Sequence, residues 1–273
     1  MLMGDIQKLD QVEAAMLQMP QAECPVVHHF GPGVYMREVT LKAGTLAIGH
    51  AQKKEHLNIV LTGAVSMVDN GQIKTVKAPL IYVGKPGRKV GYVLEDTVWL
   101  NVYSTNETDI EKLEEMFLDK SETWKQHNDS MMAIENDRRS IDREDFKKLI
   151  KEAGFTEEIV REQSENEDDQ ILMPEGYAWV TVRPSAIEGK GVFLSSPFSA
   201  GAIIGPARVD GKRTPLGRFT NHSMTPNAQF IKNGDDIWMV ALEDIDGCKG
   251  GSYGQEVTVN YREALALSGR QIQ

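Results

Sequence analysis

The chain has 273 residues, with 40 acidic and 30 basic side chains, 41% hydrophobic residues and two cysteines. This composition is typical of a soluble globular protein of one or two domains and excludes a disulfide scaffold, a collagen and a disordered chain. No apolar run approaches the ~20 residues needed to cross a bilayer, and the first ten residues do not read as a leader. We therefore expect a cytoplasmic protein with no membrane partner.

The net charge of −10 is concentrated in one part of the chain. Residues 106–170 carry 21 acidic and 10 basic side chains, whereas the flanking regions are close to neutral. The acidity therefore indicates a linker and not a binding surface. Because the sequence contains no basic stripe, we expect no nucleic-acid partner.

The first region is rich in short β-type runs that are separated by glycine, proline or Asn-Gly signals. Asp69-Asn70-Gly71 is the strongest hairpin signal among them. Many short strands without intervening helices favour a sandwich or a small barrel. The predicted strands are Val34–Leu41, Thr45–His50, Leu57–Val68, Gln72–Val76, Leu80–Val83, Lys89–Leu94 and Thr97–Tyr103.

Five residues of this region, Gly44, His50, Gln52, His56 and Gly63, follow a known spacing. It resembles the first motif of the cupin barrels, in which two histidines and a glutamate bind a metal. Here Gln52 replaces one of those histidines and His56 replaces the glutamate, so that His50 and His56 are only weak metal candidates. We expect residues 1–105 to form a cupin-like β-barrel that serves packing or homo-oligomer formation.

The second region, residues 106–173, is predicted to be a short, acidic and helical linker. Thr108 and Glu111 suggest a capping box for a helix of about four turns. A second helix is predicted from an apolar face that Gly154 ends, and Thr156 is placed to cap a third. The apolar face consists of Phe146, Leu149, Ile150 and Ala153. The run 162–170 is almost wholly charged or amide and is expected to be a solvated linker.

The third region contains three segments that matter together. Residues 188–193 form a glycine-bracketed turn, residues 218–228 read RFTNHSMTPNA, and residues 256–261 read EVTVNY. Taken singly, each has an ordinary explanation: a tight turn, side chains that bond to a loop, and a tyrosine of the core. Their order along the chain is far more specific than any one of them.

In this order the segments resemble the GxG turn, the RFxNHSCxPN loop and the ELxxDY strand end of the SET-domain protein lysine methyltransferases. The resemblance covers roughly residues 176–263, and the loop departs from the pattern only at Thr220 and Met224. It implies a minimal SET domain over residues 174–273, with a β-clip fold and a pseudoknot that Pro226 and Asn227 would pin. The whole chain is then expected to be mainly β.

The resemblance also implies the cofactor and the site. S-adenosyl-L-methionine would be the methyl donor, and a protein with a target lysine would be the substrate. Tyr261 matches the catalytic tyrosine of the family and would orient the lysine amine, not act as a general base. The residues that match cofactor-binding positions are Gly189, Lys190, Gly191, Phe219, Asn221 and His222.

Departures from the family pattern leave the activity open. Only 30 positions separate Gly191 from Asn221, where larger members have a substrate-binding insert, so the domain resembles short viral relatives. Only 12 residues follow Tyr261, which leads us to expect no zinc-bound lid. Met224 and Asn260 replace the usual cysteine and aspartate.

Three hypotheses follow from the sequence. The first is an S-adenosyl-L-methionine-dependent protein-lysine N-methyltransferase. The second is a catalytically silent SET and cupin protein with a binding or structural role, for example in a viral particle, where its location would be the virion or the host cytoplasm. The third is a metal-dependent cupin enzyme with an accessory SET module, which the depleted ligand set disfavours.

Overall fold

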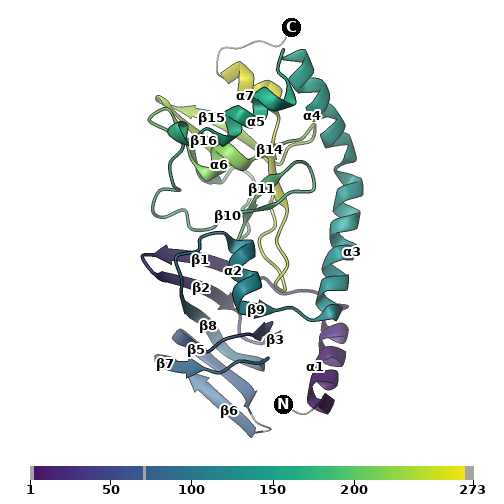
Figure 1. Cartoon of the computed structure of the whole chain (residues 1–273). Helices are drawn as coiled ribbons and strands as arrows, with labels where there is room; N and C mark the ends of the chain where they lie inside the picture. Colours follow the sequence, from purple (N-terminus) through teal and green to yellow (C-terminus); the bar gives the residue numbers. More distant parts are fainter. Residues whose placement is uncertain (1–2, 70–71, 268–273) are drawn as a thin grey trace. The chain divides into compact units, whose positions relative to one another are not determined.

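The computed structural model describes residues 3–69 and 72–267 and is mainly β, as the sequence predicts (Figure 1). The chain divides into two compact units. The first consists of residues 1–131 together with 248–252, and the second of residues 132–247 together with 253–273. Within the described ranges, no helix is both long enough and apolar enough to span a membrane.

The first unit is built on one sheet of seven strands, with the order β1-β2-β8-β5-β6 and with β3 and β7 added to β8 and β5. All of its described strand pairs are antiparallel. Its elements are α1 (Met3–Met16), β1 (Val26–Gly31), β2 (Val34–Leu41), β3 (Leu46–Ile48), β4 (Ala51–Gln52), β5 (His56–Asp69), β6 (Gln72–Lys77), β7 (Leu80–Gly84), β8 (Val90–Ser104), α2 (Ile110–Phe117) and β9 (Leu118–Asp119).

The predicted strands of this unit are found, with two differences. The last two predicted runs are a single strand, β8, because Glu95 pairs with Ala64 of β5 and the strand continues through an irregularity in the register. The expected closed barrel is not seen: among the described strand pairs, none joins β1 to β6, so the sheet stays open. The predicted hairpin turn at Asn70-Gly71 lies outside the described residues.

The core of the first unit follows from the alternation of side chains along its strands. One cluster consists of Val60, Val65, Met67, Val93 and Trp99. A second cluster joins Tyr35 and Tyr103 of the sheet to Leu113 and Phe117 of α2, so the short amphipathic helix α2 covers this part of the sheet (Figure 1).

The helical region differs from the sequence prediction at its start. The N-cap of α2 is Asp109, whose side chain accepts from the backbone of Glu111 and Lys112, and not Thr108. The predicted four-turn helix is two helices, because the chain extends at Leu118 to form β9 before α3 (Glu122–Arg138) begins. The polar stretch after residue 126 is helical as well.

The other two helices agree with the prediction. Helix α4 (Ser140–Glu152) is followed by Gly154 at φ +73°, and Thr156 caps α5 (Glu157–Glu165) by accepting from Ile159 N. The run 162–170 is partly ordered, since α5 continues to Glu165 and a 3-10 turn, η1, spans Glu167–Asp169. Asp169 is ion-paired with Arg213, so this run is not only a solvated linker.

The second unit contains two four-stranded sheets, ordered β10-β11-β17-β14 and β13-β12-β16-β15. Its elements after η1 are β10 (Val180–Pro184), β11 (Lys190–Leu194), β12 (Ile203–Val209), β13 (Lys212–Arg213), α6 (Pro215–Phe219), β14 (Asn221–His222), β15 (Ala228–Asn233), β16 (Asp236–Ala241), β17 (Glu256–Val259) and α7 (Tyr261–Leu267). Its core includes the fully buried Val192, Leu194, Ile204, Leu216, Met239 and Val257.

Candidate functional site

The predicted glycine turn connects β10 to β11. Ser185 closes it: its backbone N donates to Gly189 O at 2.9 Å, and its Oγ accepts from Ile187 N at 2.8 Å. Gly189 has φ +51°, and the space that a Cβ would occupy there is open. The backbone conformation therefore favours glycine at position 189, and the turn keeps one open side.

Gly191 is needed for a different reason. A Cβ at this position would lie 2.2 Å from Glu256 Oε1, so the absence of a side chain makes room for the Glu256 carboxyl. This carboxyl is buried, and both of its oxygens lie 2.8 Å from Ser185 Oγ. Burial raises the pKa of Glu256, although the hydrogen bonds from Asn221 and Ser185 act in the opposite direction.

Asn221 brings the loop, the turn and the last strand together. Its Nδ2 lies 2.8 Å from Glu256 Oε1 and 2.9 Å from Ser185 Oγ, and it is 3.1 Å from the carbonyl oxygens of both Glu188 and Lys190. An amide nitrogen has two hydrogens, so these four acceptors share them. The side chain of Asn221, in the loop, thus contacts both the glycine turn and Glu256, the first residue of the third segment.

The loop is also held beside β17, as expected for a crossing pinned by Asn227. Strand β14 pairs with β17 in parallel, with Asn221 opposite Thr258. Asn227 Nδ2 donates to Glu256 O at 2.9 Å, and Asn227 Oδ1 accepts from Thr258 N at 2.8 Å. A buried amide that bonds to the backbone of another strand fixes the register of the two segments.

His222 is buried and links the loop to Tyr261. Its Nδ1 accepts from Tyr261 N at 3.1 Å, so the neutral ring carries its proton on Nε2, which lies 2.7 Å from Asp145 Oδ2. Asp145, on α4, also binds the guanidinium of Arg262 at 2.6 and 3.1 Å. The pKa of Asp145 is lowered to about 2, chiefly by the hydrogen bond from Arg262 and further by that from His222.

The sequence analysis missed these acidic partners. Asp145 binds His222, and Asp142, which is buried, accepts from Ser223 Oγ at 2.9 Å and from Met224 N at 3.0 Å. The two aspartates are three positions apart on α4 and so lie on one helical face. That spacing was the available signal, but it lies in a segment whose many charges suggested only solvation.

Tyr261 lies at the start of α7. Its hydroxyl donates to Thr220 O at 2.8 Å, its ring meets the ring of Phe146 edge-on at 6.0 Å, and burial raises its pKa. The tyrosine therefore stays protonated at neutral pH, and its orientation is fixed by the loop.

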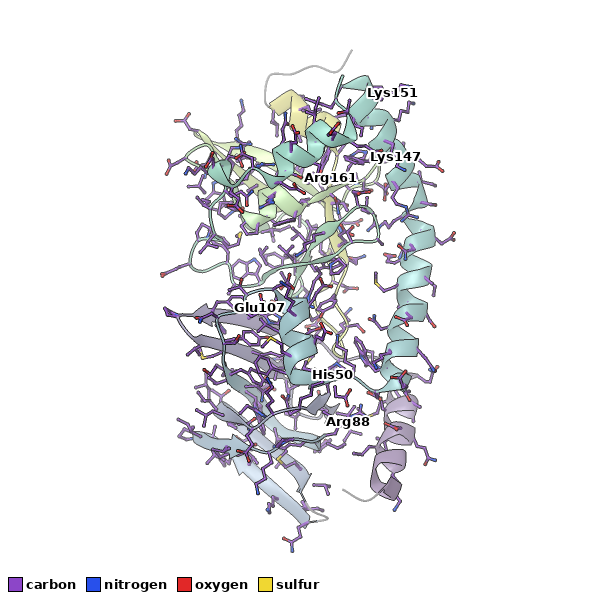
Figure 2. All side chains as sticks on the ribbon, in the orientation of Figure 1. His50, Arg88, Glu107, Lys147, Lys151 and Arg161 are labelled. Atoms are coloured by element: carbon purple, nitrogen blue, oxygen red, sulfur yellow. The ribbon has the colours of Figure 1, made fainter. Side chains whose placement is uncertain are left out.

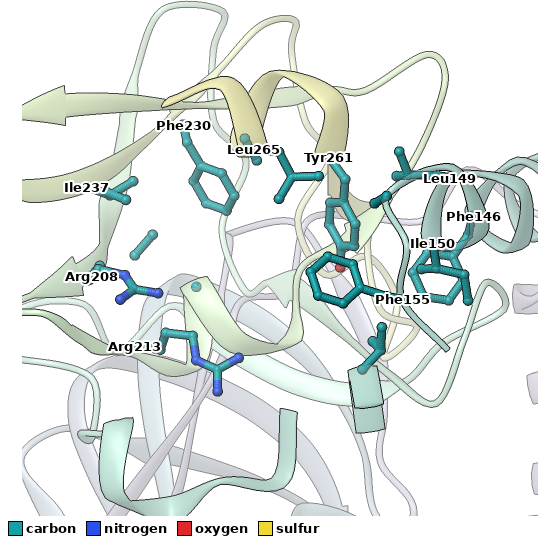
Figure 3. A pocket seen from close by; sticks show the side chains of 15 residues that line it. Phe146, Leu149, Ile150, Phe155, Arg208, Arg213, Phe230, Ile237, Tyr261 and Leu265 are labelled. Atoms are coloured by element: carbon teal, nitrogen blue, oxygen red, sulfur yellow. The ribbon is translucent and has the colours of Figure 1, made fainter. Parts of the chain in front are cut away.

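A pocket of about 230 Å³ opens beside Tyr261 (Figure 3). Four aromatic rings and several aliphatic side chains form most of its wall, and two arginines stand at one side (Figure 3). Of the seven residues predicted for cofactor and catalysis, only Tyr261 lines it. The lining residues are Phe146, Leu149, Ile150, Ala153, Phe155, Val160, Ala207, Arg208, Arg213, Gly217, Phe230, Ile237, Tyr261, Ala264 and Leu265.

Two predicted residues lie apart from these contacts. Phe219 packs against the core of the second unit, and the guanidinium of Arg218 lies 4.7 Å from the centre of its ring. The side chain of Lys190 is exposed, so only the backbone of this residue faces Asn221.

The histidines of the first unit are not gathered into a ligand set. His56 Nδ1 lies 3.0 Å from Lys54 O, and Gln52 Oε1 accepts from Tyr103 at 2.7 Å. The ring of His50 meets Trp124 edge-on at 4.8 Å. In the part of the chain that the structure describes, no three His, Cys, Asp or Glu side chains are grouped so that they could hold a metal ion.

Several solved structures have a likeness to about a third of this chain. KdgF from Halomonas sp. shares 14% identity, covers 34% of this chain and 90% of its own, and has a TM-score of 0.28. An RmlC-like cupin family protein from Methanocaldococcus jannaschii shares 13% identity over 34% and 87% of the two chains, with a TM-score of 0.27. The Cupin_2 domain of an XRE family transcriptional regulator from Enterobacter cloacae shares 13% identity over 32% and 100%, with a TM-score of 0.26. Similarity at this level does not bear on function.

No curated protein matches the sequence. The family model of the SET domain matches residues 85–262, which is more than half of the chain and extends well upstream of the three motifs. Both the motif contacts around Asn221 and this match lead to the same conclusion: the chain belongs to the SET-domain family.

Proposed function

We propose that this protein is an S-adenosyl-L-methionine-dependent protein-lysine N-methyltransferase. The observation that carries the proposal is the position of Asn221, whose amide lies within 3.1 Å of the glycine turn and within 2.8 Å of Glu256. The neighbouring residue, His222, holds the backbone of Tyr261. Membership of the SET family supports the reaction class, and the contacts support the place where it would occur.

The chemistry around Asn221 fits the proposed cofactor. The Glu188 and Lys190 carbonyls and the Glu256 carboxyl are hydrogen-bond acceptors that converge on the Asn221 amide nitrogen. Acceptors of this kind stabilise a positively charged ligand. S-adenosyl-L-methionine has both an ammonium and a sulfonium group, so these residues are suited to hold its methionine end.

The pocket beside Tyr261 fits the side chain of the substrate. Its volume of about 230 Å³ is below the ~300–1,000 Å³ of most ligand pockets, which suits a single side chain better than a nucleoside. Aromatic and aliphatic walls accommodate the methylene groups of lysine. They also disfavour the charged ammonium, and the reaction requires the neutral amine.

When bound, S-adenosyl-L-methionine would supply the methyl group for an in-line displacement, in which a lysine amine that has already lost one proton to solvent forms a nitrogen–carbon bond as the sulfur–carbon bond breaks. The residues of this chain would then act by positioning. Tyr261 stays protonated, and its hydroxyl donates a hydrogen bond to Thr220 O. The lone pairs of the Tyr261 oxygen can then accept a hydrogen bond from the amine. The pocket walls would exclude water.

One observation favours the catalytically silent alternative. Both hydrogens of Asn221 Nδ2 are already shared among protein acceptors, so this amide would have to give up a contact in order to bind a ligand through its nitrogen. A SET and cupin protein of this kind would use the fold to bind a partner and would not turn over.

Calorimetry and mass spectrometry of the full chain separate these proposals. We expect S-adenosyl-L-methionine to bind and methyl groups to appear on lysines of a protein extract. A Tyr261→Phe variant should retain the cofactor and lose methyl transfer by at least about 100-fold. The absence of cofactor binding would refute the proposal. Cofactor binding with no methylated lysine would favour the silent protein. Full activity of the Tyr261→Phe variant would refute the role of Tyr261.

A further inference from the structure

We propose that the first unit contains a second ligand site, which binds a small organic carboxylate between Arg37 and His50 on one face of its sheet. Figure 2 shows His50 among the side chains of this unit. The site shares no residue with the proposed methyl-transfer site, and it does not depend on that function.

A polar row crosses five strands of the sheet at one register. Arg37 on β2 pairs with His28 on β1 and with Asn101 on β8. Asn58 on β5 pairs with Asn101 and with Tyr82 on β7. Because directly paired residues of neighbouring strands point to the same side of a sheet, these five side chains lie on one face.

The polar row lies between two rows of a different character. On one side, the paired residues are apolar: Val26, Val39, Trp99 and Val60. On the other side they are the aromatic residues Phe30, Tyr35 and Tyr103. The polar row therefore lies between residues that are mostly buried: Val60 and Trp99 belong to one core cluster, and Tyr35 and Tyr103 pack against α2.

Several side chains of the row are hydrogen-bonded to each other or to the neighbouring rows, but that of Arg37 is not. Asn58 Oδ1 accepts from Trp99 Nε1 at 2.8 Å and from Asn101 Nδ2 at 2.9 Å, and His28 Nδ1 lies 2.7 Å from the Tyr35 hydroxyl. Within residues 3–69 and 72–267, by contrast, the side chain of Arg37 makes no hydrogen bond and no ion pair, and its Nε is enclosed by the protein.

An unsatisfied and enclosed guanidinium nitrogen is costly, and in a native protein it calls for a partner. The two terminal nitrogens of Arg37 are also unpaired but are not shut off, so the end of the side chain stays accessible. Burial acts to lower the pKa of Arg37, but Tyr35 and Glu114 raise it overall, so the group is charged. Glu114 itself is ion-paired with Lys120 at 2.8 Å.

His50 provides a second unsatisfied group, two residues before Gln52, whose side chain accepts from the Tyr103 hydroxyl of the aromatic row. Its Nδ1 is enclosed and has no partner, and its ring is held by the edge-on contact with Trp124. The pKa of His50 is lowered to about 3 by burial first and by the charge of Arg37 second, so the ring is neutral at pH 7. A neutral imidazole can place its single N–H on either nitrogen and so can donate to an acceptor.

These features specify the ligand as a singly charged carboxylate. A guanidinium matches the two oxygens of a carboxylate in a bidentate arrangement. The other nearby cations are already neutralised, since Lys120 binds Glu114 and Arg88 binds Glu13. One unpaired positive charge balances one negative charge.

Calorimetry on the full chain, with sodium benzoate and sodium acetate as probes, tests the site. We expect benzoate to bind, and benzamide, which has the same shape without the charge, to bind at least about tenfold more weakly. Arg37→Gln should lose at least about tenfold in benzoate affinity, and Arg37→Lys should not restore it, because lysine lacks the planar fork. Lys42→Gln, at an exposed ion pair just beyond β2, is the control and should bind like the natural protein.

Two results would overturn the proposal: no heat from either carboxylate up to about 10 mM, or equal benzoate affinity in the Arg37→Gln protein. A second measurement needs no variant. Butanedione modifies accessible arginines, and benzoate should protect Arg37 from it when the modified peptides are counted by mass spectrometry, with the exposed guanidinium of Arg138 as the reference. Equal modification of Arg37 with and without benzoate would show that the anion binds elsewhere.

Discussion

Asp145 Oδ2 lies 2.7 Å from His222 Nε2, and through this contact helix α4 holds the imidazole ring beside the candidate site. The other ring nitrogen of His222 accepts from the backbone of Tyr261. Asp145 thus reaches the predicted catalytic tyrosine through a buried imidazole. In this arrangement Asp145 is a positioning residue, since it acts only through His222 and Arg262.

The first prediction concerns Asp145→Asn. The amide keeps the shape but loses the charge that binds both His222 and Arg262, so we expect the free energy of unfolding to fall by about 1–3 kcal/mol. Urea unfolding measures this loss. Methyl transfer should fall more than cofactor affinity, because the variant loosens the backbone of Tyr261. Glu144→Gln, at an exposed position of the same helix, is the matched control, and a comparable effect there would contradict the role of Asp145.

The second prediction is the pH dependence of this stabilisation. The pKa of Asp145 is lowered from 3.8 to about 2 by folding, so its contribution is complete above pH 3.8 and is lost as the pH falls toward 2. The difference in unfolding free energy between the natural protein and the Asp145→Asn protein should therefore be constant from about pH 5 to 7 and shrink below pH 4. A difference that instead grew with acid would show that this carboxylate is not the titrating group.

The third prediction separates stability from ligand binding at Glu256. Burial raises the pKa of this carboxyl, so its charge at pH 7 opposes folding, and Glu256→Gln should leave the protein equally stable or more stable. If the carboxyl helps to hold a cationic cofactor, the same variant should bind S-adenosyl-L-methionine about tenfold more weakly, or by ~1.4 kcal/mol.

Thermal unfolding and calorimetry of the same preparation measure both effects. Glu188→Gln is the control, because its side chain is exposed and only its carbonyl reaches Asn221. Unchanged cofactor affinity in Glu256→Gln would assign this residue to the packing of the turn alone.

Local patterns in the sequence predicted much of the fold. The β runs, Gly154 as a helix end and Thr156 as a cap all depend on neighbours within a few residues, and the structure confirms them. The single strand β8 was not predictable in this way, since it continues past Glu95 only because β5 supplies backbone partners on both sides of a register shift. The open sheet likewise depends on which strands pair, and that is a property of the tertiary structure.

The candidate site shows the same division. The motifs indicated Asn221, His222 and Tyr261, and in the structure Asn221 contacts the turn and His222 contacts Tyr261. Asp145 was not found, because its three-residue spacing from Asp142 lies in a region that its excess of acidic residues led us to interpret as a linker. The row around Arg37 was missed for a related reason: it joins five strands by register, and no local spacing reveals it.

The last prediction tests the pocket as the place of the substrate side chain. Ala153 of the α4–α5 connection lines the pocket, and Ala153→Phe would fill much of its volume of about 230 Å³. We expect methyl transfer to fall by at least about tenfold, while cofactor affinity changes by less than about twofold, because none of the residues around Asn221 lines the pocket. Methyl transfer is measured by mass spectrometry of lysines and cofactor affinity by calorimetry. Ala133→Phe, at an exposed position of α3, should leave both unchanged. Loss of cofactor binding in Ala153→Phe, with the fold intact by circular dichroism, would mean that the pocket holds the cofactor and that the lysine approaches from elsewhere.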